Sequence, residues 1–453
     1  MLIGVKIKNA RPLVTSPSSD RLSPMANGIN DDVLRLIFED FTCGEPWKWP
    51  DAVYDQERAR GPFLLAAVSR RWRNLALDTA ALWSYFGFPG DAVLYPKHVE
   101  RLRVLLEASK NIPVDINVTL GTPYDYEGRM LTQSTRLGAG ILETLGSLGP
   151  RWRNVRFRLP SEATAHLRPA LQKLMPNLVS LSAVTGVKWN ILPLAPRLER
   201  LYVEWVQFNG GPNMTAPRWQ YPAMTSFAVM GESLVLALST QNFSDLTDVC
   251  FMHNMNDLPK SPLQFPQLLS LVLEDPRFMS FIQAPRLAQL GVNGSRRFDF
   301  PQPLPDFPTV ESLIIFGEAA DDLAKGLWAL SSIRTLNFHT PISIQTCFVR
   351  EPEYSASALF FHSLNEDPRG LTWPQLRQIH FKQPNRDGAI AECHNDSLLE
   401  FVRKRNTDYA LAQRAERIDE IILDHPNVMQ QETAETLAEL STLRRTYYFA
   451  DSE

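Results

Sequence analysis

The chain has few of the residues that build stapled or metal-bound domains. Four cysteines occur in 453 residues, Cys43, Cys250, Cys347 and Cys393, and none forms a Cys-x-x-Cys pair. This spacing supports neither a disulfide framework nor a zinc site. The eight histidines are spread singly, and none has a carboxylate or a second histidine at metal-binding spacing. We therefore expect no metal and no cofactor.

A strong charge of either sign is also absent. The chain carries 46 Lys+Arg against 50 Asp+Glu, for a formal net charge of −4. We expect neither a nucleic acid nor a membrane as the main partner. The densest basic stretch, Arg151 to Arg158, has its arginines in a strand register, and we interpret it as a solvated strand flank rather than a phosphate-binding patch. No signal-peptide pattern and no bilayer-length apolar run occur, which predicts a cytoplasmic or nuclear protein.

Motifs for catalysis are missing as well. No Walker-type Gly-Lys-Ser/Thr and no Gly-x-Ser-x-Gly sequence occurs, and Gly138-Ala-Gly140 lacks the third glycine of a dinucleotide loop. We find no nucleophile with a plausible base. The sequence therefore predicts a protein that is not an enzyme, with a hydrolase or transferase as the least favoured class.

What the sequence does contain is a repeated phrase. The phrase is eight residues long and begins with proline, as in residues 196–203 (PRLERLYV). Its third, sixth and eighth residues are apolar, and the others vary. The phrase returns at Pro266, Pro285, Pro308 and Pro374. A phrase that returns at a near-constant period indicates an array of stacked units, and such arrays mostly bind other macromolecules.

The spacing of the units is that of a leucine-rich repeat. Their first apolar anchors are Trp152, Leu178, Leu198, Met224, Leu246, Leu268, Leu287, Val310, Ile333, Leu376 and Ile418. Successive gaps are 19 to 26 residues, except for the last two of 43 and 42 residues. If each long gap hides one degenerate unit, twelve intervals span 418 − 152 = 266 residues, about 22 per unit. Leucine-rich repeats have periods of roughly 20 to 29 residues.

Each unit is predicted to contribute one short strand. Apolar, variable, apolar is the period-two pattern of a strand with one buried face. The proline stops a preceding helix and turns the chain into the strand. The connections are too long for hairpins, so the strands are expected to run parallel. The predicted fold class is α/β, with an irregular leucine-rich-repeat-like solenoid at residues 150–425 and a C-terminal helical cap at 426–453.

A small helical module is predicted ahead of the array, at residues 27–88, after a flexible leader at 1–26. From Ile29 to Phe41 apolar residues recur at intervals of three and four behind an Asn30/Asp31 cap, as in an amphipathic helix. Thr42 to Gly61 is predicted to be a loop. A second helical pattern then runs from Phe63 to Ala76, and no strand periodicity is present.

Four short motifs mark this module: INDDVL at 29–34, Ile37-Phe38, VSRRWR at 68–73 and Leu82-Trp83. They resemble the opening, helix end, Val-Cys-Arg-x-Trp-Arg and Leu-Trp of the F-box domain, in the form common in fungal F-box proteins. Asn30 stands in place of the customary proline and Ser69 in place of the usual cysteine. The region at 89–149, with a helical pattern and a first strand, is similar to the segment that leads such proteins into their repeats.

The resemblance implies a substrate-recognition subunit of an SCF-type (cullin-RING) ubiquitin ligase. Its F-box would bind a Skp-type adaptor, and through it a cullin, while the repeats bind an unknown target protein. The residues implied for the docking face and its supporting core, two roles that the sequence does not separate, are Ile29, Val33, Leu34, Ile37, Phe38, Leu64, Val68, Trp72, Leu82 and Trp83. The alternative is a leucine-rich-repeat scaffold whose F-box no longer binds the adaptor.

The target would bind the open face of the array, where the residues between buried strand positions point. The candidate target-binding residues are Tyr202, Glu204, Met230, Met252, Val272, Ile314, Phe316, His339 and His380. A mostly apolar strip with a polar rim is typical of a partner surface. Two arrangements stay open: the strip is exposed, or inter-strand loops or the helices after Gln430 cover it.

Overall fold

The computed structural model describes residues 29–43, 54–88, 96–120, 132–159, 163, 165–185, 193–204, 221–230, 244–252, 261–293, 307–316, 326–339, 356–365, 373–382, 396–407, 415–423 and 431–445. The predicted leader at 1–26 lies outside these residues. The chain divides into two compact units, the first comprising Met1–Gly87 and Glu100–Ile112 and the second Phe88–Val99 and Pro113–Glu453.

The first unit is mainly helical. Its elements are α2 (Asp31–Cys43), α3 (Gln56–Val68), α4 (Arg70–Asp78), the 3-10 turn η1 (Ala80–Trp83) and most of the short strand β1 (Tyr85–Phe88), and α5 (Pro96–Ala108) contributes its second half. Helix α2 confirms the predicted amphipathic helix. The prediction that this module contains no strand is wrong, because Tyr85–Phe88 forms strand β1.

Two other predictions for the first unit were wrong. The loop predicted to reach Gly61 ends earlier, because α3 begins at Gln56, where the Asp55 carboxylate accepts a hydrogen bond from the Arg58 amide at 2.8 Å. The pattern from Phe63 to Ala76 is two helices rather than one. Ser69 breaks it with an extended backbone and accepts a hydrogen bond from the Trp72 amide at 3.1 Å, which caps α4.

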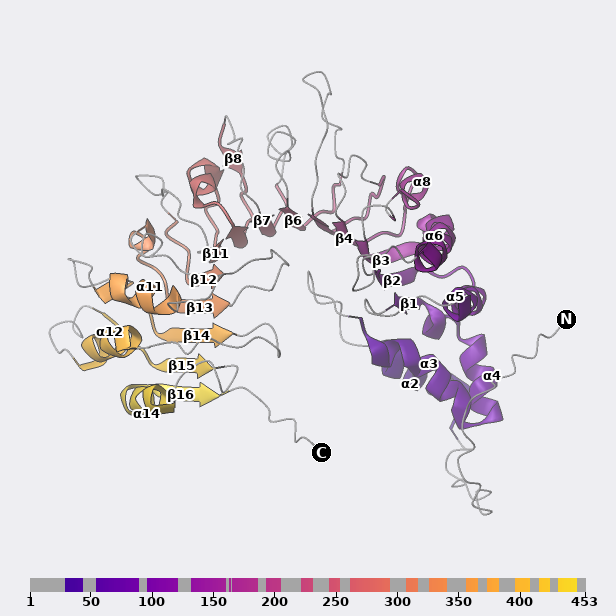
Figure 1. Ribbon diagram of the computed structural model, residues 1–453, viewed down its shortest axis with the longest axis horizontal. Helices are drawn as coiled ribbons and strands as arrows, with labels where there is room; N and C mark the ends of the chain where they lie inside the picture. Colours follow the sequence, from indigo (N-terminus) through magenta and orange to yellow (C-terminus); the bar gives the residue numbers. More distant parts are fainter. Residues whose placement is uncertain are drawn as a thin grey trace, which may run out of the picture. The chain divides into compact units, whose positions relative to one another are not determined.

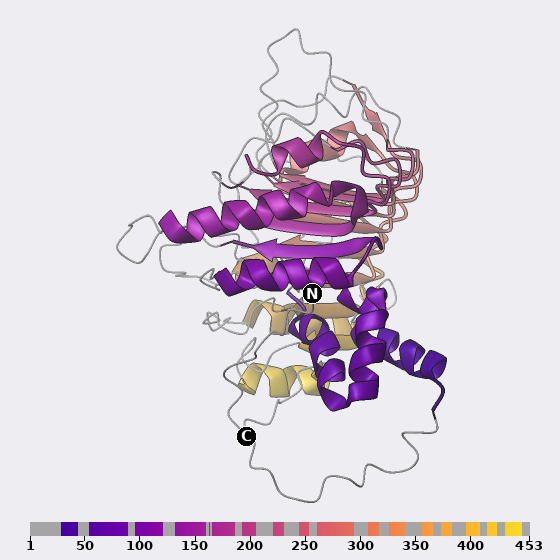
Figure 2. The same ribbon diagram turned by 90° about the vertical axis from the view of Figure 1, so that its right-hand side faces the viewer.

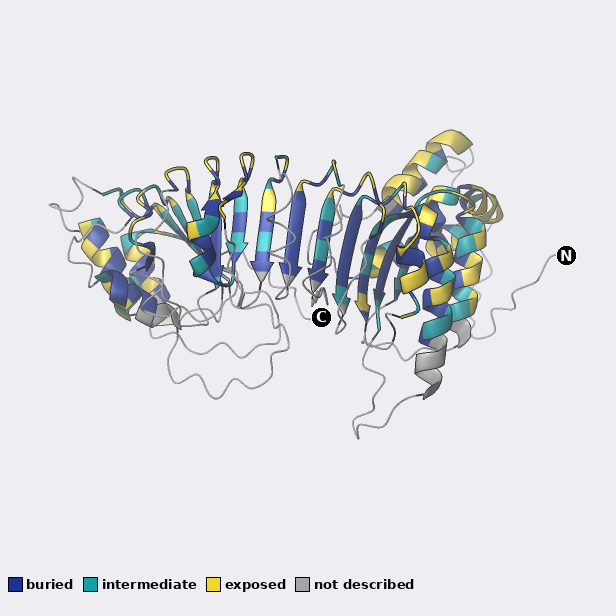
Figure 3. Cartoon of the chain, turned by 90° about the horizontal axis from the view of Figure 1, so that it is seen from above, coloured by how far each residue is buried: buried dark blue, intermediate teal, exposed yellow. Residues whose placement is uncertain are grey.

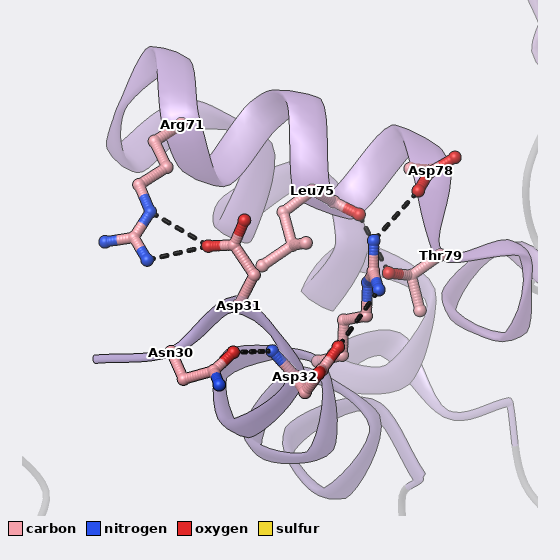
Figure 4. A network of polar contacts seen from close by, with 8 residues as sticks. Asn30, Asp31, Asp32, Arg71, Leu75, Asp78 and Thr79 are labelled. Atoms are coloured by element: carbon pink, nitrogen blue, oxygen red, sulfur yellow. Dashed lines mark hydrogen bonds and ion pairs between the residues drawn. The ribbon is translucent and has the colours of Figure 1, made fainter. Parts of the chain in front are cut away.

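Polar contacts join the start of α2 to α4 (Figure 4). Asn30 Oδ1 accepts a hydrogen bond from the Asp32 amide at 2.9 Å and so caps α2, as the sequence predicted. The Arg71 guanidinium reaches Asp31 Oδ1 at 2.7 Å. Arg35 forms ion pairs with Asp32 and with Asp78 of α4, at 3.3 and 3.0 Å. These contacts lie on the exposed surface where the two helices meet.

The second unit is built on a parallel sheet. The sheet has fourteen strands in the order β1-β2-β3-β4-β5-β6-β7-β9-β11-β12-β13-β14-β15-β16, and every pairing from β2 to β16 is parallel (Figure 1). Its strands after β1 are β2 (Val114–Thr119), β3 (Trp152–Leu159), β4 (Ser180–Thr185), β5 (Arg200–Glu204), β6 (Ser226–Met230), β7 (Asp248–Met252), β9 (Ser270–Leu273), β11 (Gln289–Asn293), β12 (Ser312–Phe316), β13 (Thr335–His339), β14 (Gln378–Lys382), β15 (Glu420–Leu423) and β16 (Thr442–Arg445). The fold class is therefore α/β, with a long parallel sheet and helices.

The predicted anchors set the start of the strands. All of them are buried, and each anchor from Leu178 to Ile418 lies two residues before the first residue of a strand. The turns that carry the anchors lie side by side at one end of the strands, and Figure 3 shows the exposed colour on many of them. Proline, with its fixed φ, fits the first turn residue at Pro196, Pro266, Pro285 and Pro308.

The hidden units predicted in the last two gaps are wrong. Strand β13 pairs directly with β14, through Thr335 and Gln378, and β14 pairs directly with β15, through Gln378 and Glu420. No further strand can stand between hydrogen-bonded neighbours. Helices α11 (Ala356–Asn365) and α12 (Asp396–Thr407) lie in these gaps instead, so the last units are longer rather than more numerous.

One face of the second unit's sheet carries its helices. Helices α6 (Thr132–Ser147), α8 (Arg168–Leu171), α11, α12 and α14 (Gln431–Leu440) all lie on this face (Figure 1). Figure 2 shows α6 running alongside the strands. Two short 3-10 turns, η2 (Gly149–Arg151) and η3 (Pro276–Phe281), and a small sheet of β8 (Leu263–Gln264) and β10 (Ile282–Gln283) complete the connections that are described.

The main core of the second unit fills the space between sheet and helices. Near the C-terminal end the Phe338 ring lies 5.5 Å from Phe360 and from Phe361 of α11 and 5.2 Å from Phe381. The chain after residue 425 contains helix α14 and also strand β16, which pairs with β15, so this segment continues the sheet. Among the described residues, no helix has the length and apolar character needed to cross a membrane.

Candidate functional site

The first candidate surface lies on α2 and α3 of the first unit. On α2, Val33, Leu36, Ile37 and Phe41 are 47%, 66%, 48% and 57% exposed. Their spacing of three and four residues places them on one side of the helix, next to the buried side. Apolar side chains therefore occupy more than half of the circumference of α2, which is more than its own core requires.

The apolar side chains of α3 continue this surface. Gly61, Leu64 and Val68 share one side of α3, because they are spaced by three and four residues. A Cβ at Gly61 would lie 3.5 Å from the Phe41 ring and 2.9 Å from the Thr42 methyl carbon, so the helices meet closely there. Leu64 and Val68 are 57% and 52% exposed. We call Val33, Leu36, Ile37, Phe41, Leu64 and Val68 the helix surface.

The predicted adaptor-binding residues divide by burial. Ile29, Val33, Ile37, Leu64 and Val68 are exposed, whereas Leu34, Phe38, Leu82 and Trp83 are at most 3% exposed. Trp72 is half-buried, with its ring 4.8 Å from that of Phe38. The buried residues form the supporting core and offer no contact surface. Leu36 was missing from the prediction, although its spacing of three from Val33 could have identified it.

The second candidate surface is the face of the sheet opposite the helices, called here the sheet face. Strand register places its residues in rows that cross the strands. The central row, one residue per strand from β2 to β14, is Asn117, Arg156, Ser182, Tyr202, Ala228, Cys250, Val272, Gly291, Ile314, Asn337 and His380. Four of the nine predicted target-binding residues belong to this one row: Tyr202, Val272, Ile314 and His380.

The predicted residues at the strand ends form a second row. Glu204 pairs with Met230, and Met230 with Met252; further along, Phe316 pairs with His339. The backbone register thus places the predicted residues in two adjacent rows. The side chains of Glu204, Met230, Met252 and His339 lie outside the described residues.

The middle of the sheet face is small and apolar. Ala228, Val272 and Ile314 line it, and the Val272 and Phe316 side chains fill the space beside Gly291. A Cβ at Gly291 would lie 2.8 Å from the Phe316 ring and 2.9 Å from a Val272 methyl carbon. Tyr202, Val272, Phe316 and His380 are partly exposed, whereas Ile314 is buried. The described side chains therefore leave part of this strip accessible.

The Cys250 thiol lies in the central row of the sheet face. Burial, and secondarily the charge of Glu274, raises the pKa of the Cys250 thiol to about 12, so the thiol is protonated at neutral pH and a poor nucleophile. Within the described ranges, no three or more His, Cys, Asp and Glu residues are grouped so that they could hold a metal ion.

Strands β3 and β5 of the sheet carry arginines. Arg156 and Arg158, interpreted as a solvated strand flank, pair with Ser182 and Val184 of β4, and Arg200 of β5 pairs with Ser180. Because alternate residues of a strand point to the same face, all three arginines belong to the sheet face. The sequence signal for this was the register of Arg156 and Arg158, read together with the position of Arg200 before Tyr202.

No protein-family model matches this chain, and no curated protein matches it in sequence.

Proposed function

We propose that this chain is a non-catalytic substrate receptor of an SCF-type ubiquitin ligase. In this proposal the first unit is an F-box module that binds a Skp-type adaptor, and through it a cullin. The parallel sheet is an irregular leucine-rich-repeat solenoid whose sheet face holds a target protein. The chain itself carries out no chemistry. It raises the effective concentration of the target near the ligase.

The observation that carries the proposal is the helix surface. Monomeric proteins rarely expose a contiguous group of large apolar side chains unless it binds a partner. A unit this small also buries little core of its own, and an adaptor that covered the helix surface would stabilise it. Three of its residues, Val33, Ile37 and Val68, belong to the segments that carry the F-box resemblance, INDDVL with Ile37-Phe38, and VSRRWR.

The repeat supports the second half of the proposal. From β3 to β13 the paired strand positions recur every 19 to 26 residues, in parallel register and with a turn before each later strand, which is the arrangement expected of leucine-rich repeats. Such arrays bind proteins on the extended surface formed by their strands. The accessible apolar strip from Tyr202 to Phe316 lies on that surface.

Co-purification of the full chain with a Skp-type adaptor tests the adaptor half. The variants Val33→Asp and Ile37→Asp place a charge on the helix surface, and each should weaken binding at least roughly tenfold. Leu34→Asp is unsuitable, because Leu34 is 1% exposed and a buried charge would unfold the unit. Leu194→Asp is the matched control, since Leu194 is 66% exposed in the second unit.

Binding by the wild type and by Leu194→Asp, but not by the two α2 variants, would establish the adaptor site. Circular dichroism would verify that each variant is folded. A folded wild-type chain that binds no Skp-type adaptor would refute the ligase assignment and leave a repeat scaffold in its place.

A further inference from the structure

The leader contains a short apolar stretch of sequence. Residues 2–8, LIGVKIK, lie outside the described residues and are called here the apolar segment. From Ile3 to Lys8 apolar residues alternate with glycine and lysine. In an extended chain such alternation gathers the apolar side chains on one side. Residues 9–28 show no such alternation and contain three prolines and four serines instead. The apolar segment is therefore the part of the leader with a sequence suited to bind an apolar surface.

The helix surface matches the apolar segment in spacing. Val33, Ile37 and Phe41 follow one another along α2 at intervals of four residues, which is a rise of about 6 Å each. Alternate residues of an extended chain are about 7 Å apart. The side chains of Ile3, Val5 and Ile7 therefore fit against these three residues in order. The exposed Leu64 and Val68 of α3 widen the surface that they would cover.

The charges of the two segments are opposite in sign. The leader carries Lys6, Lys8 and Arg11, and its first acid is Asp20. Helix α2, DDVLRLIFEDFTC, has four acids and one arginine, for a net charge of 1 − 4 = −3. A basic segment is thus attracted to α2, whereas a second copy of the acidic α2 is repelled from it.

Two of the acids on α2 are available to the lysines. The two acids at the start of the helix already pair with arginines, as described above. Glu39 and Asp40 are exposed, and neither forms an ion pair with another described residue. Asp40 lies three residues from Ile37, so its carboxylate borders the apolar side chains of the helix surface. Exposed ion pairs are individually weak. Charge therefore orients the apolar segment, and apolar contact holds it.

We propose that residues 2–8 bind the helix surface of their own chain and compete with the partner that uses it. Residues 9–28 end next to α2, and 20 residues reach up to about 66 Å when extended. The linkage makes the contact intramolecular, at an effective concentration on the order of millimolar, so a contact too weak to form between separate chains is populated within one.

The contact regulates the surface that the adaptor would occupy. A partner binds only the fraction of chains in which the helix surface is free, so its apparent affinity falls by that fraction. Under the proposed function this partner is a Skp-type adaptor. The competition with the adaptor therefore rests on the proposed function, whereas the contact of residues 2–8 with α2 does not.

The contact is measured first without an adaptor. A fluorescent peptide of residues 1–11 should bind a chain that lacks residues 2–8, as followed by fluorescence polarisation. The intact chain should bind the peptide at least about threefold more weakly, because its own segment occupies the surface. Ile37→Asp in the shortened chain should weaken peptide binding at least about fivefold. Leu194→Asp, an exposed position of the second unit, is the matched control and should leave binding unchanged.

The competition is measured with a Skp-type adaptor. Val5→Asp with Ile7→Asp in the full chain should raise the affinity for the adaptor at least about threefold, as should deletion of residues 2–8. Leu13→Asp with Val14→Asp adds the same charge to the leader outside the apolar segment and should leave the affinity unchanged. Equal adaptor affinity in all of these folded chains would overturn the competition.

Other outcomes assign the apolar segment differently. A folded shortened chain that does not bind the peptide, or binds it equally well with Ile37→Asp, would overturn the contact. Dimers of the intact chain that disappear on deletion of residues 2–8 would show that the segment covers a second copy. Binding to phosphatidylserine vesicles that is lost on deletion, without peptide binding, would assign the segment to a membrane and overturn the proposal. Peptide binding without adaptor binding would support the contact and refute the ligase assignment, so the two fail separately.

Discussion

Replacing Arg405 with methionine should loosen the C-terminal part of the sheet. Arg405 of α12 is 6% exposed, and burial lowers the pKa of its guanidinium to about 10. The guanidinium donates to three backbone carbonyls, Glu416 O at 3.0 Å, Trp373 O at 2.7 Å and Leu376 O at 3.2 Å. Two of them precede β14 and one precedes β15, so one side chain joins the entry turns of two neighbouring strands to α12.

The size of the effect follows from these contacts. Hydrogen bonds to a charged group contribute about 1.5 kcal/mol each at the lower end of their range, or roughly 4.5 kcal/mol for three. Methionine keeps much of the volume and no longer buries a charge, which returns about 1.5 kcal/mol. The net loss of local stability in Arg405→Met should be about 3 kcal/mol, and protection of β14 and β15 amides should fall about a hundredfold.

Hydrogen exchange measured by mass spectrometry is the assay, because a chain with two units does not unfold in one step. Peptides from Gln378–Lys382 and Glu420–Leu423 should lose protection, while peptides from β3 keep theirs. Arg403→Met, an exposed arginine of the same helix, is the control. If the protection of these peptides falls less than threefold, or falls equally in both variants, Arg405 does not stabilise the junction between α12 and the two strands.

Three further changes test other parts of the structure. Ser69→Ala removes the cap of α4 and should lower the stability of the first unit by about 1 kcal/mol, measured by hydrogen exchange of α4 amides. Ser69→Asp should keep the stability of the wild type, because aspartate also caps helices. A Ser69→Asp variant as unstable as Ser69→Ala would contradict the capping role. Burial raises the pKa of Tyr85 from 10.0 to about 12, so the folded chain keeps the Tyr85 proton to a higher pH than the unfolded chain does. The contribution of protonated Tyr85 to the free energy of unfolding is therefore fully present below pH 10 and is lost as the pH rises towards 12. Between these values the free energy of unfolding of the wild type, measured by urea titration, should fall by about 1.4 kcal/mol per pH unit relative to that of Tyr85→Phe. The same pH dependence in both proteins would contradict this. Gly291→Ala brings a methyl group against Phe316 and should lower stability by about 1 kcal/mol, measured as faster exchange of β12 amides. Unchanged exchange would show that Phe316 and Val272 do not crowd position 291.

The strands could be predicted from the sequence because their signal is local. An anchor such as Leu198 and the alternation of Leu201 and Val203 lie within six residues, and both patterns reflect burial on the helix side of the sheet. The contents of the long gaps could not be predicted this way. Spacing alone does not distinguish a degenerate strand from a helix, and α11 is held by tertiary contacts of Phe360 and Phe361 with Phe338 rather than by a repeated phrase.

Periodicity alone could not predict which apolar residues of α2 are buried and which belong to the helix surface. In α2 the apolar residues occupy both the side of Leu34 and Phe38 and the side of Val33 and Ile37, so the pattern alone does not say which side is core. In the structure the buried side is that of Leu34 and Phe38, where the Trp72 ring lies 4.8 Å from the Phe38 ring.

The two departures from the F-box pattern have a common structural explanation. A proline at position 30 could not accept a hydrogen bond with its side chain, whereas Asn30 Oδ1 caps α2 through the Asp32 amide at 2.9 Å. A cysteine at position 69 would offer a weak sulfur acceptor, whereas Ser69 Oγ caps α4 through the Trp72 amide at 3.1 Å. Both changes therefore act at helix starts and leave Val33 and Ile37 exposed on α2. The substitutions alone are consequently no argument against adaptor binding, and the binding experiment with Val33→Asp tests the surface itself rather than its caps.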